Sequence, residues 1–125
     1  TSKVELKTEN GKGEIILDWS SYDIKDKHFV IYRKQENQEN WEKIVQSEQK
    51  LTGSSYIDIL GIDKNYPNMP KIKIEKNEEN NDINIIAMSE DNGTKYSYYI
   101  ESYDNTTNQL LNTSNQSSEN MTSLF

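Results

Sequence analysis

Residues 94–104 read TKYSYYIESYD and form the most strand-like segment of this chain. Because successive side chains of a β-strand point to opposite faces, Tyr96, Tyr98 and Ile100 share one face. Aromatic and β-branched residues suit a half-buried pleated surface. The stretch therefore predicts a long central strand of an antiparallel sandwich, with these three side chains in the core.

Turn-forming residues bound this stretch on both sides. Asn92-Gly93 precedes it and Asp104-Asn105 follows it, and both pairs are typical of tight turns. A tyrosine that opens a strand directly after such a corner, as Tyr96 does, is typical of a sandwich in which the hydroxyl bonds back to the upstream loop.

Length and charge limit the class of protein and its partners. The 125 residues suit one domain, which can form a core without the disulfides or thiolate metal sites that the absence of cysteine excludes. The net charge of −7, from 21 acidic and 14 basic residues, argues against nucleic acid as a partner. No apolar run approaches the roughly 20 residues of a membrane span. No signal peptide is visible, so any targeting segment is expected outside this sequence.

Further short runs with strand-like alternation are separated by turn residues along the whole chain. They cover residues 3–8, 14–19, 28–34, 41–45, 53–59 and 109–114. No stretch has a sustained helical period, so the pattern predicts an all-β sandwich over residues 1–114. Residues 115–125 are rich in Ser, Asn and Thr and are expected to be a flexible tail or linker.

Residues 60–91 are more than a minimal sandwich needs, and three explanations compete. Residues 71–76 and 83–88 alternate around a polar loop and spell a hairpin, which can be an insertion in one sandwich. Alternatively, residues 83–88 are the true fifth strand and residues 54–59 belong to the insert. In the third explanation, the sequence carries two incomplete modules. We prefer one domain, because a half of about sixty residues could not close a sandwich alone.

The order of these features resembles the fibronectin type III family, in the version common in bacterial secreted and surface proteins. The marks are Ile15, Leu17 and Trp19 in the second strand, Phe29, Ile31, Tyr32 and Arg33 in the third, residues 54–58 in the fifth and residues 92–104 in the sixth. The resemblance implies an immunoglobulin-like antiparallel β-sandwich with Tyr96 at the tyrosine-corner position. The expected core comprises Trp19, Leu17, Phe29, Ile31, Tyr96, Tyr98 and Ile100.

An outward-facing set of aromatic residues is the candidate ligand-binding surface. It comprises Trp41, Tyr32, Tyr99 and Tyr103. Such a surface can stack on sugars or hold a protein partner. The simpler interpretation, which we favour from the sequence, is cross-strand pairing that covers the outside of the sheet.

Titratable residues offer little for catalysis or metal binding. His28, the only histidine, is expected to be solvated or a local hydrogen-bond donor at the start of a strand. Two carboxylate sets were weighed as calcium ligands: Glu78, Glu79 and Asp82 in one loop, and the scattered Asp58, Asp63 and Asp91. A charged run between strands is usually a solvated turn, so we expect no metal and no cofactor.

The sequence shows no activated nucleophile, carboxylate pair or phosphate-binding loop, so we expect no enzyme. The leading hypothesis, which follows from the resemblance, is a non-catalytic module of a secreted or cell-surface bacterial protein, such as an adhesin, toxin or hydrolase. It would act as a spacer or protein-binding unit beside other domains of the same polypeptide. The alternative is a glycan- or host-receptor-binding domain of a bacterial toxin or adhesin, formed by the insert and the aromatic face.

Overall fold

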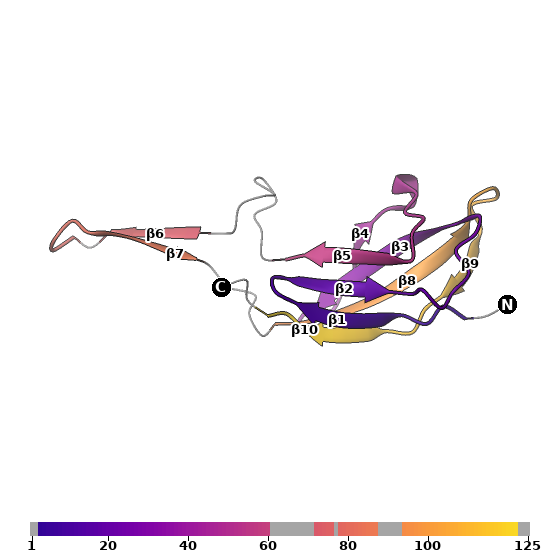
Figure 1. Ribbon diagram of the computed structural model, residues 1–125, viewed down its shortest axis with the longest axis horizontal. Coiled ribbons are helices and arrows are strands. Elements are labelled where there is room, and N and C mark those ends of the chain that lie inside the picture. The colour runs from indigo at the N-terminus through magenta and orange to yellow at the C-terminus, as the bar shows by residue number, and fades with distance from the viewer. Residues whose placement is uncertain (1–2, 61–71, 77, 88–93, 123–125) are drawn as a thin grey trace.

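The computed structural model describes residues 3–60, 72–76, 78–87 and 94–122, and shows two antiparallel sheets face to face (Figure 1). The first sheet has the order β1-β2-β5, from β1 (Lys7–Gly11), β2 (Glu14–Asp18) and β5 (Ser55–Ile59). The second has the order β10-β8-β3-β4, with β9 also paired to β8, from β3 (Lys27–Gln35), β4 (Glu42–Val45), β8 (Lys95–Asp104), β9 (Leu110–Thr113) and β10 (Ser117–Asn120). The predicted all-β sandwich is confirmed. Within the described residues there is no helix long and apolar enough to cross a membrane.

Inward-facing side chains of the two sheets meet in one core. All the residues expected there are buried: Leu17, Trp19, Phe29, Ile31, Tyr96, Tyr98 and Ile100. The Trp19 ring, which follows β2, packs against the Phe29 ring of β3 with centroids 5.1 Å apart. This contact joins the two sheets, and the alternation of β8 places Tyr96 and Tyr98 where their rings fill the same layer.

Tyr96, the second residue of β8, lies at the expected tyrosine-corner position. Its ring is buried, and Gln35 Nε2 of the neighbouring β3 donates a 3.4 Å hydrogen bond to its hydroxyl. The Arg33 guanidinium lies 5.7 Å from the ring centroid. The upstream loop that was expected to return a bond, residues 88–93, lies outside the described residues. The corner bond therefore stays a prediction, while the contacts with β3 are established.

The pairing of β5 decides between the three explanations of the insert. β5 pairs along β2, with Ile57 opposite Ile16, so residues 55–59 are the fifth strand of the sandwich. β6 (Ile72–Lys76) and β7 (Ile83–Ala87) pair with each other in a separate two-stranded sheet, which Figure 1 shows beside the sandwich. The second sheet also combines strands from both halves of the chain. The insert is therefore a hairpin, and the other two explanations are wrong.

Replacing residues 62–91 by a flexible Gly/Ser linker should leave the sandwich folded. The hairpin contributes no strand to either large sheet, and changing the length of a flexible loop alters closure entropy by only about 1 kcal/mol. Urea unfolding followed by far-UV circular dichroism should show a cooperative transition within about 1 kcal/mol of the original chain. Loss of cooperativity would contradict this expectation.

The expectation that residues 115–125 form a flexible tail is wrong for their described part. β10 pairs with the first half of β8, with Ser117 opposite Tyr98, and so continues the edge that β9 begins. Met121, just after β10, is buried in the core. The segment is polar because backbone hydrogen bonds, rather than an apolar face, hold most of it. Composition alone therefore predicted a linker where the structure has an edge strand.

The first strand also begins later than expected, at Lys7 rather than Lys3. Val4 and Leu6 are buried as the alternation suggests, but asparagine side chains bind their backbone. Asn112 Oδ1 accepts from Val4 N at 2.9 Å, and Asn115 Oδ1 accepts from Leu6 N at 2.8 Å. Asn115 Nδ2 also donates to Leu6 O at 3.1 Å. Asn115 thus imitates a strand partner, and the amino-terminal segment covers the edge of β9.

Candidate binding surface

The outer face of the second sheet carries three partly exposed aromatic side chains, Tyr32, Trp41 and Tyr99, which we call the aromatic cluster. Tyr32 on β3 lies opposite Tyr99 on β8, and their rings stack with centroids 4.5 Å apart and 11° between planes. Trp41, just before β4, meets Tyr99 edge to face at 4.7 Å and 78°. Such pairs contribute about 0.5–1.5 kcal/mol beyond their burial. The structure thus brings together three of the four residues expected on this surface.

Two lysines that the sequence analysis did not single out complete the aromatic cluster. Lys43 Nζ lies 5.6 Å from the Tyr32 centroid and Lys34 Nζ lies 5.0 Å from the Trp41 centroid. The strand order places Lys43 on β4 and the Tyr99 ring on β8 at opposite sides of Tyr32. Both faces of the Tyr32 ring are therefore covered. Side-chain alternation could have identified Lys34 from the sequence, because Lys34 lies two residues after Tyr32 and therefore on the same face of the strand.

Tyr103, the fourth candidate, is linked to the aromatic cluster through the Glu101 carboxylate rather than through its ring. Its ring stacks on His28 with centroids 5.5 Å apart, and its hydroxyl donates to Glu101 Oε1 at 3.0 Å. Glu101 stands between Tyr99 and Tyr103 on the outer face of β8. The expected stripe is therefore three contacting rings, with Tyr103 linked to them through the Glu101 carboxylate.

Burial raises the pKa of the Tyr32, Tyr99 and Tyr103 hydroxyls, and the Glu101 carboxylate raises the pKa of each further. A neighbouring negative charge disfavours a phenolate, so these hydroxyls remain neutral hydrogen-bond donors well into the alkaline range. At neutral pH the face thus presents lysine ammonium groups, neutral phenols and the Glu101 carboxylate.

His28 is fully buried, so the solvated alternative is wrong, and the histidine is a hydrogen-bond donor whose partners are distant in the chain rather than local. Its Nδ1 lies 2.7 Å from Asn105 Oδ1, and its Nε2 lies 2.9 Å from Ser47 Oγ in the 3₁₀ turn η1 (Ser47–Gln49). Because an amide oxygen only accepts, Nδ1 carries the proton that it donates to Asn105. The imidazole joins β3 to η1 and to the loop after β8, and its role is structural.

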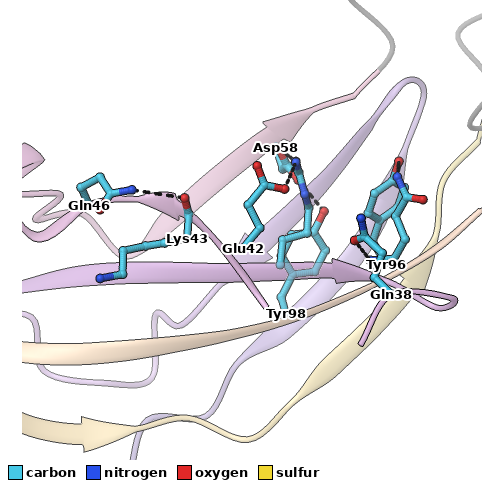
Figure 2. Close-up of polar contacts among 9 residues, drawn as sticks. Gln38, Glu42, Lys43, Gln46, Asp58, Tyr96 and Tyr98 are labelled. Atoms are coloured by element: carbon cyan, nitrogen blue, oxygen red, sulfur yellow. Dashed lines mark hydrogen bonds and ion pairs between the residues drawn. The ribbon is translucent and has the colours of Figure 1, made fainter. Parts of the chain in front are cut away.

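A buried charged network crosses between the sheets near the aromatic cluster. Arg33 Nη1 on β3 donates to both carboxylate oxygens of Asp58 on β5, at 3.0 and 2.9 Å. The Tyr98 hydroxyl on β8 donates a hydrogen bond to Asp58 Oδ2 at 2.6 Å. Figure 2 shows the Tyr98 hydroxyl beside the Asp58 carboxylate. Arg33 Nη2 also lies 3.3 Å from the exposed Glu42 carboxylate. Asp58 is therefore a structural anchor between layers, which the sequence analysis weighed only as a metal ligand.

This network should make the domain lose stability above about pH 10. Burial, and then the Asp58 carboxylate, raises the pKa of Tyr98 above its ordinary value of 10.0. The folded state keeps a proton on Tyr98 that the unfolded chain releases, so the contribution of Tyr98 to stability is complete below about pH 10 and falls by about 1.4 kcal/mol per pH unit above it. Urea unfolding between about pH 8 and pH 11 measures this slope. Tyr98→Phe should reduce the slope by up to about 1.4 kcal/mol per pH unit and leave the part that Tyr32, Tyr99 and Tyr103 contribute, and an unchanged slope would contradict the assignment.

The carboxylates weighed as calcium ligands form no metal-binding group among the described residues. Glu78, Glu79 and Asp82 lie exposed in the turn between β6 and β7, and Asp63 and Asp91 lie outside the described residues. In the part of the chain that is described, no group of three or more His, Cys, Asp or Glu side chains is placed to hold a metal ion.

No family model matches the chain, and no curated protein matches it significantly. The description as a small antiparallel two-sheet domain, compatible with an immunoglobulin-like or fibronectin type III-like sandwich, therefore rests on the strand order and the core.

Proposed function

We propose that this chain is a fibronectin type III-like, non-catalytic module of a secreted or cell-surface bacterial protein, and that it binds a protein partner through the aromatic cluster. The observation that carries the binding role is the partly exposed group of Tyr32, Trp41 and Tyr99 with its two lysines. The family and the location rest on the sequence resemblance, and the strand order of the two sheets is compatible with the family.

The arrangement of the rings favours a protein over a glycan. A sugar binds an aromatic residue by lying flat on an open ring face, whereas the faces of Tyr32 are covered by Tyr99 and Lys43. Lys34 lies over Trp41. Tyrosine and tryptophan held in fixed positions are frequent anchors in protein interfaces, because they lose little conformational entropy on binding. The flanking ammonium groups add attraction for an acidic partner surface.

The non-catalytic part of the proposal is supported by what the buried polar groups do. His28 is engaged by Asn105 and Ser47, and Asp58 by Arg33 and Tyr98. Both sets of hydrogen bonds hold the sheets and turns together. They engage the imidazole and the carboxylate that would otherwise be available as a general acid or base.

The test is a binding screen of the isolated domain on arrays of extracellular host proteins and of glycans. We expect binding on the protein array, and Trp41→Ala should weaken it at least about tenfold, as loss of an interface anchor does. Leu111→Ala is the matched control, because Leu111 is 44% exposed on β9, away from the aromatic cluster.

Each other result has a defined meaning. Equal weakening by both substitutions would contradict a role for the aromatic cluster. Binding to glycans alone would favour the receptor- or glycan-binding domain of a toxin or adhesin, to which the exposed turn at residues 78–82 would offer a second contact. No binder on either array would leave the domain as a spacer.

A further inference from the structure

The strand β5 presents an unpaired edge. Among the described residues it pairs with β2 only, and it forms the outer edge of the first sheet (Figure 1). Trp19 N donates to Ser54 O and Leu60 N donates to Gly13 O, at 2.9 and 2.8 Å. Because backbone groups of successive residues point to alternate sides of a strand, the even-numbered residues of β5 bond to β2. The N–H and C=O groups of Ser55, Ile57 and Ile59 therefore point away from the sheet.

The outward face of this edge lacks several of the features with which proteins protect exposed strands, although Asp58 of β5 is an inward-pointing charge. Such edges usually carry lysine, proline or a bulge. Here the outward side chains are those of Ser55, Ile57 and Ile59, and the two isoleucines are 48% and 53% exposed. Ile16 of β2 lies beside Ile57 on the same face, and Glu9 of β1 lies beside Ile16. The apolar stripe formed by Ile57 and Ile16 therefore starts at the open edge of the sheet and ends at the charged Glu9 on β1.

The other edges of the sandwich are closed or charged. The amino-terminal segment and β1 meet the β9–β10 edge through Asn115, through the Thr8–Ser117 hydroxyl pair at 2.7 Å and through Gly13 N, which donates to Thr122 O at 2.7 Å. β4 exposes Glu42 and Lys43. Among the described strands of the two large sheets, β5 is thus the one apolar open edge, and pairing there would end after one partner.

We propose that β5 pairs antiparallel with β5 of a second copy of this chain, forming a symmetric dimer with a continuous sheet across the interface. A two-fold axis at Ile57 places Ile57 of each copy opposite the other, and Ser55 opposite Ile59. All of these residues direct their free backbone groups to the edge, so each pair exchanges both hydrogen bonds. The stripe then runs from Ile16 and Ile57 of one copy into Ile57 and Ile16 of the next.

The chemistry of the β5 edge favours a second copy of this chain as the partner. Unpaired backbone donors and acceptors require another strand, and the outward side chains carry no charge that would select a charged peptide. The same short sequence satisfies the pairing from both sides, as an isologous interface requires. The net charge of −7 opposes the approach of two copies, so association should strengthen with salt.

Sedimentation velocity of the full chain at high salt tests the proposal, and we expect a concentration-dependent monomer–dimer equilibrium. Ile57→Lys places two ammonium groups opposite one another and should weaken the dimer at least about tenfold. Leu110→Lys, at a similarly exposed residue on β9, is the matched control and should leave the equilibrium unchanged. Unfolding curves of both variants confirm that they are folded.

Disulfide trapping tests the register, since the chain has no cysteine of its own. In the proposed dimer the Cα atoms of two Ile57→Cys chains lie about 5.5 Å apart, within disulfide reach. Two Ser55→Cys chains lie more than about 13 Å apart along the strand and should not cross-link. A mixture of Ser55→Cys and Ile59→Cys should.

A monomer at all concentrations, or a dimer that Ile57→Lys leaves intact, would overturn the proposal. If the Ile57→Cys chain and the Ser55→Cys chain, each tested by itself, cross-linked equally, the proposed register would be wrong and with it the symmetric pairing. A monomer that binds a strand peptide from another protein at β5 would assign the edge to that protein instead.

Discussion

Replacing Asp58 by alanine should lower the free energy of unfolding by about 3–5 kcal/mol. The substitution leaves the Arg33 guanidinium, whose side chain is only 12% exposed, without its main partner. It also removes the acceptor of the buried Tyr98 hydroxyl. A stranded buried charge and an unsatisfied donor cost far more than the intact network contributes, because neither group recovers its hydration. Urea unfolding at neutral pH measures the loss.

Two further variants separate these causes. Glu42→Gln removes the exposed partner of Arg33 and should change stability by less than about 1 kcal/mol. The triple variant Arg33→Met, Asp58→Leu and Tyr98→Phe removes the whole network at once and should recover most of the lost stability, since apolar side chains often replace buried ion pairs without cost. An Asp58→Ala variant as stable as the original would show that the network does not hold the sheets together.

Ending the chain after Ser114 should cost about 4 kcal/mol or more, a large part of the roughly 5–15 kcal/mol that stabilises an ordinary domain. The truncation removes β10, exposes the backbone edge of β8 and takes Met121 out of the core. It also removes Asn115, which binds the backbone of Leu6 on both its N–H and C=O. Thermal unfolding followed by circular dichroism should show a broad transition or none.

Point variants show which part of this segment matters. Met121→Ala should cost about 2–5 kcal/mol, as for other buried methionines. Ser118→Ala removes only an exposed hydroxyl contact with Ser97 and should change stability by less than about 1 kcal/mol. A truncated chain that unfolds like the original would restore the description of this segment as a tail.

The strand at residues 94–104 could be read from the sequence because its signal is local. Alternating aromatic residues between turn-forming pairs place Tyr98 and Ile100 inward without knowledge of the neighbouring strands, and both are buried. The outward position of Tyr99 follows from the same alternation. Its partners do not, because stacking on Tyr32 depends on the register between β8 and β3.

β5 shows where local pattern misleads. By hydrophobicity alone, Ile57 and Ile59 would form the buried face of this strand. The structure instead turns Asp58 inward, to Arg33 and Tyr98, and leaves both isoleucines exposed. A shift of one residue exchanges the two faces of a strand, and here a charge partner on another sheet selects the face.

The sequence by itself determined the class of the fold, the central strand and the residues of its core, because turn chemistry and side-chain alternation act over a few neighbouring residues. The tertiary structure decided which strand is fifth, that β10 belongs to the sandwich and that His28 and Asp58 are buried. It also decided how the aromatic cluster assembles. These features depend on hydrogen bonds and charge pairs between residues far apart in the chain, whose partners appear only when the sheets are packed.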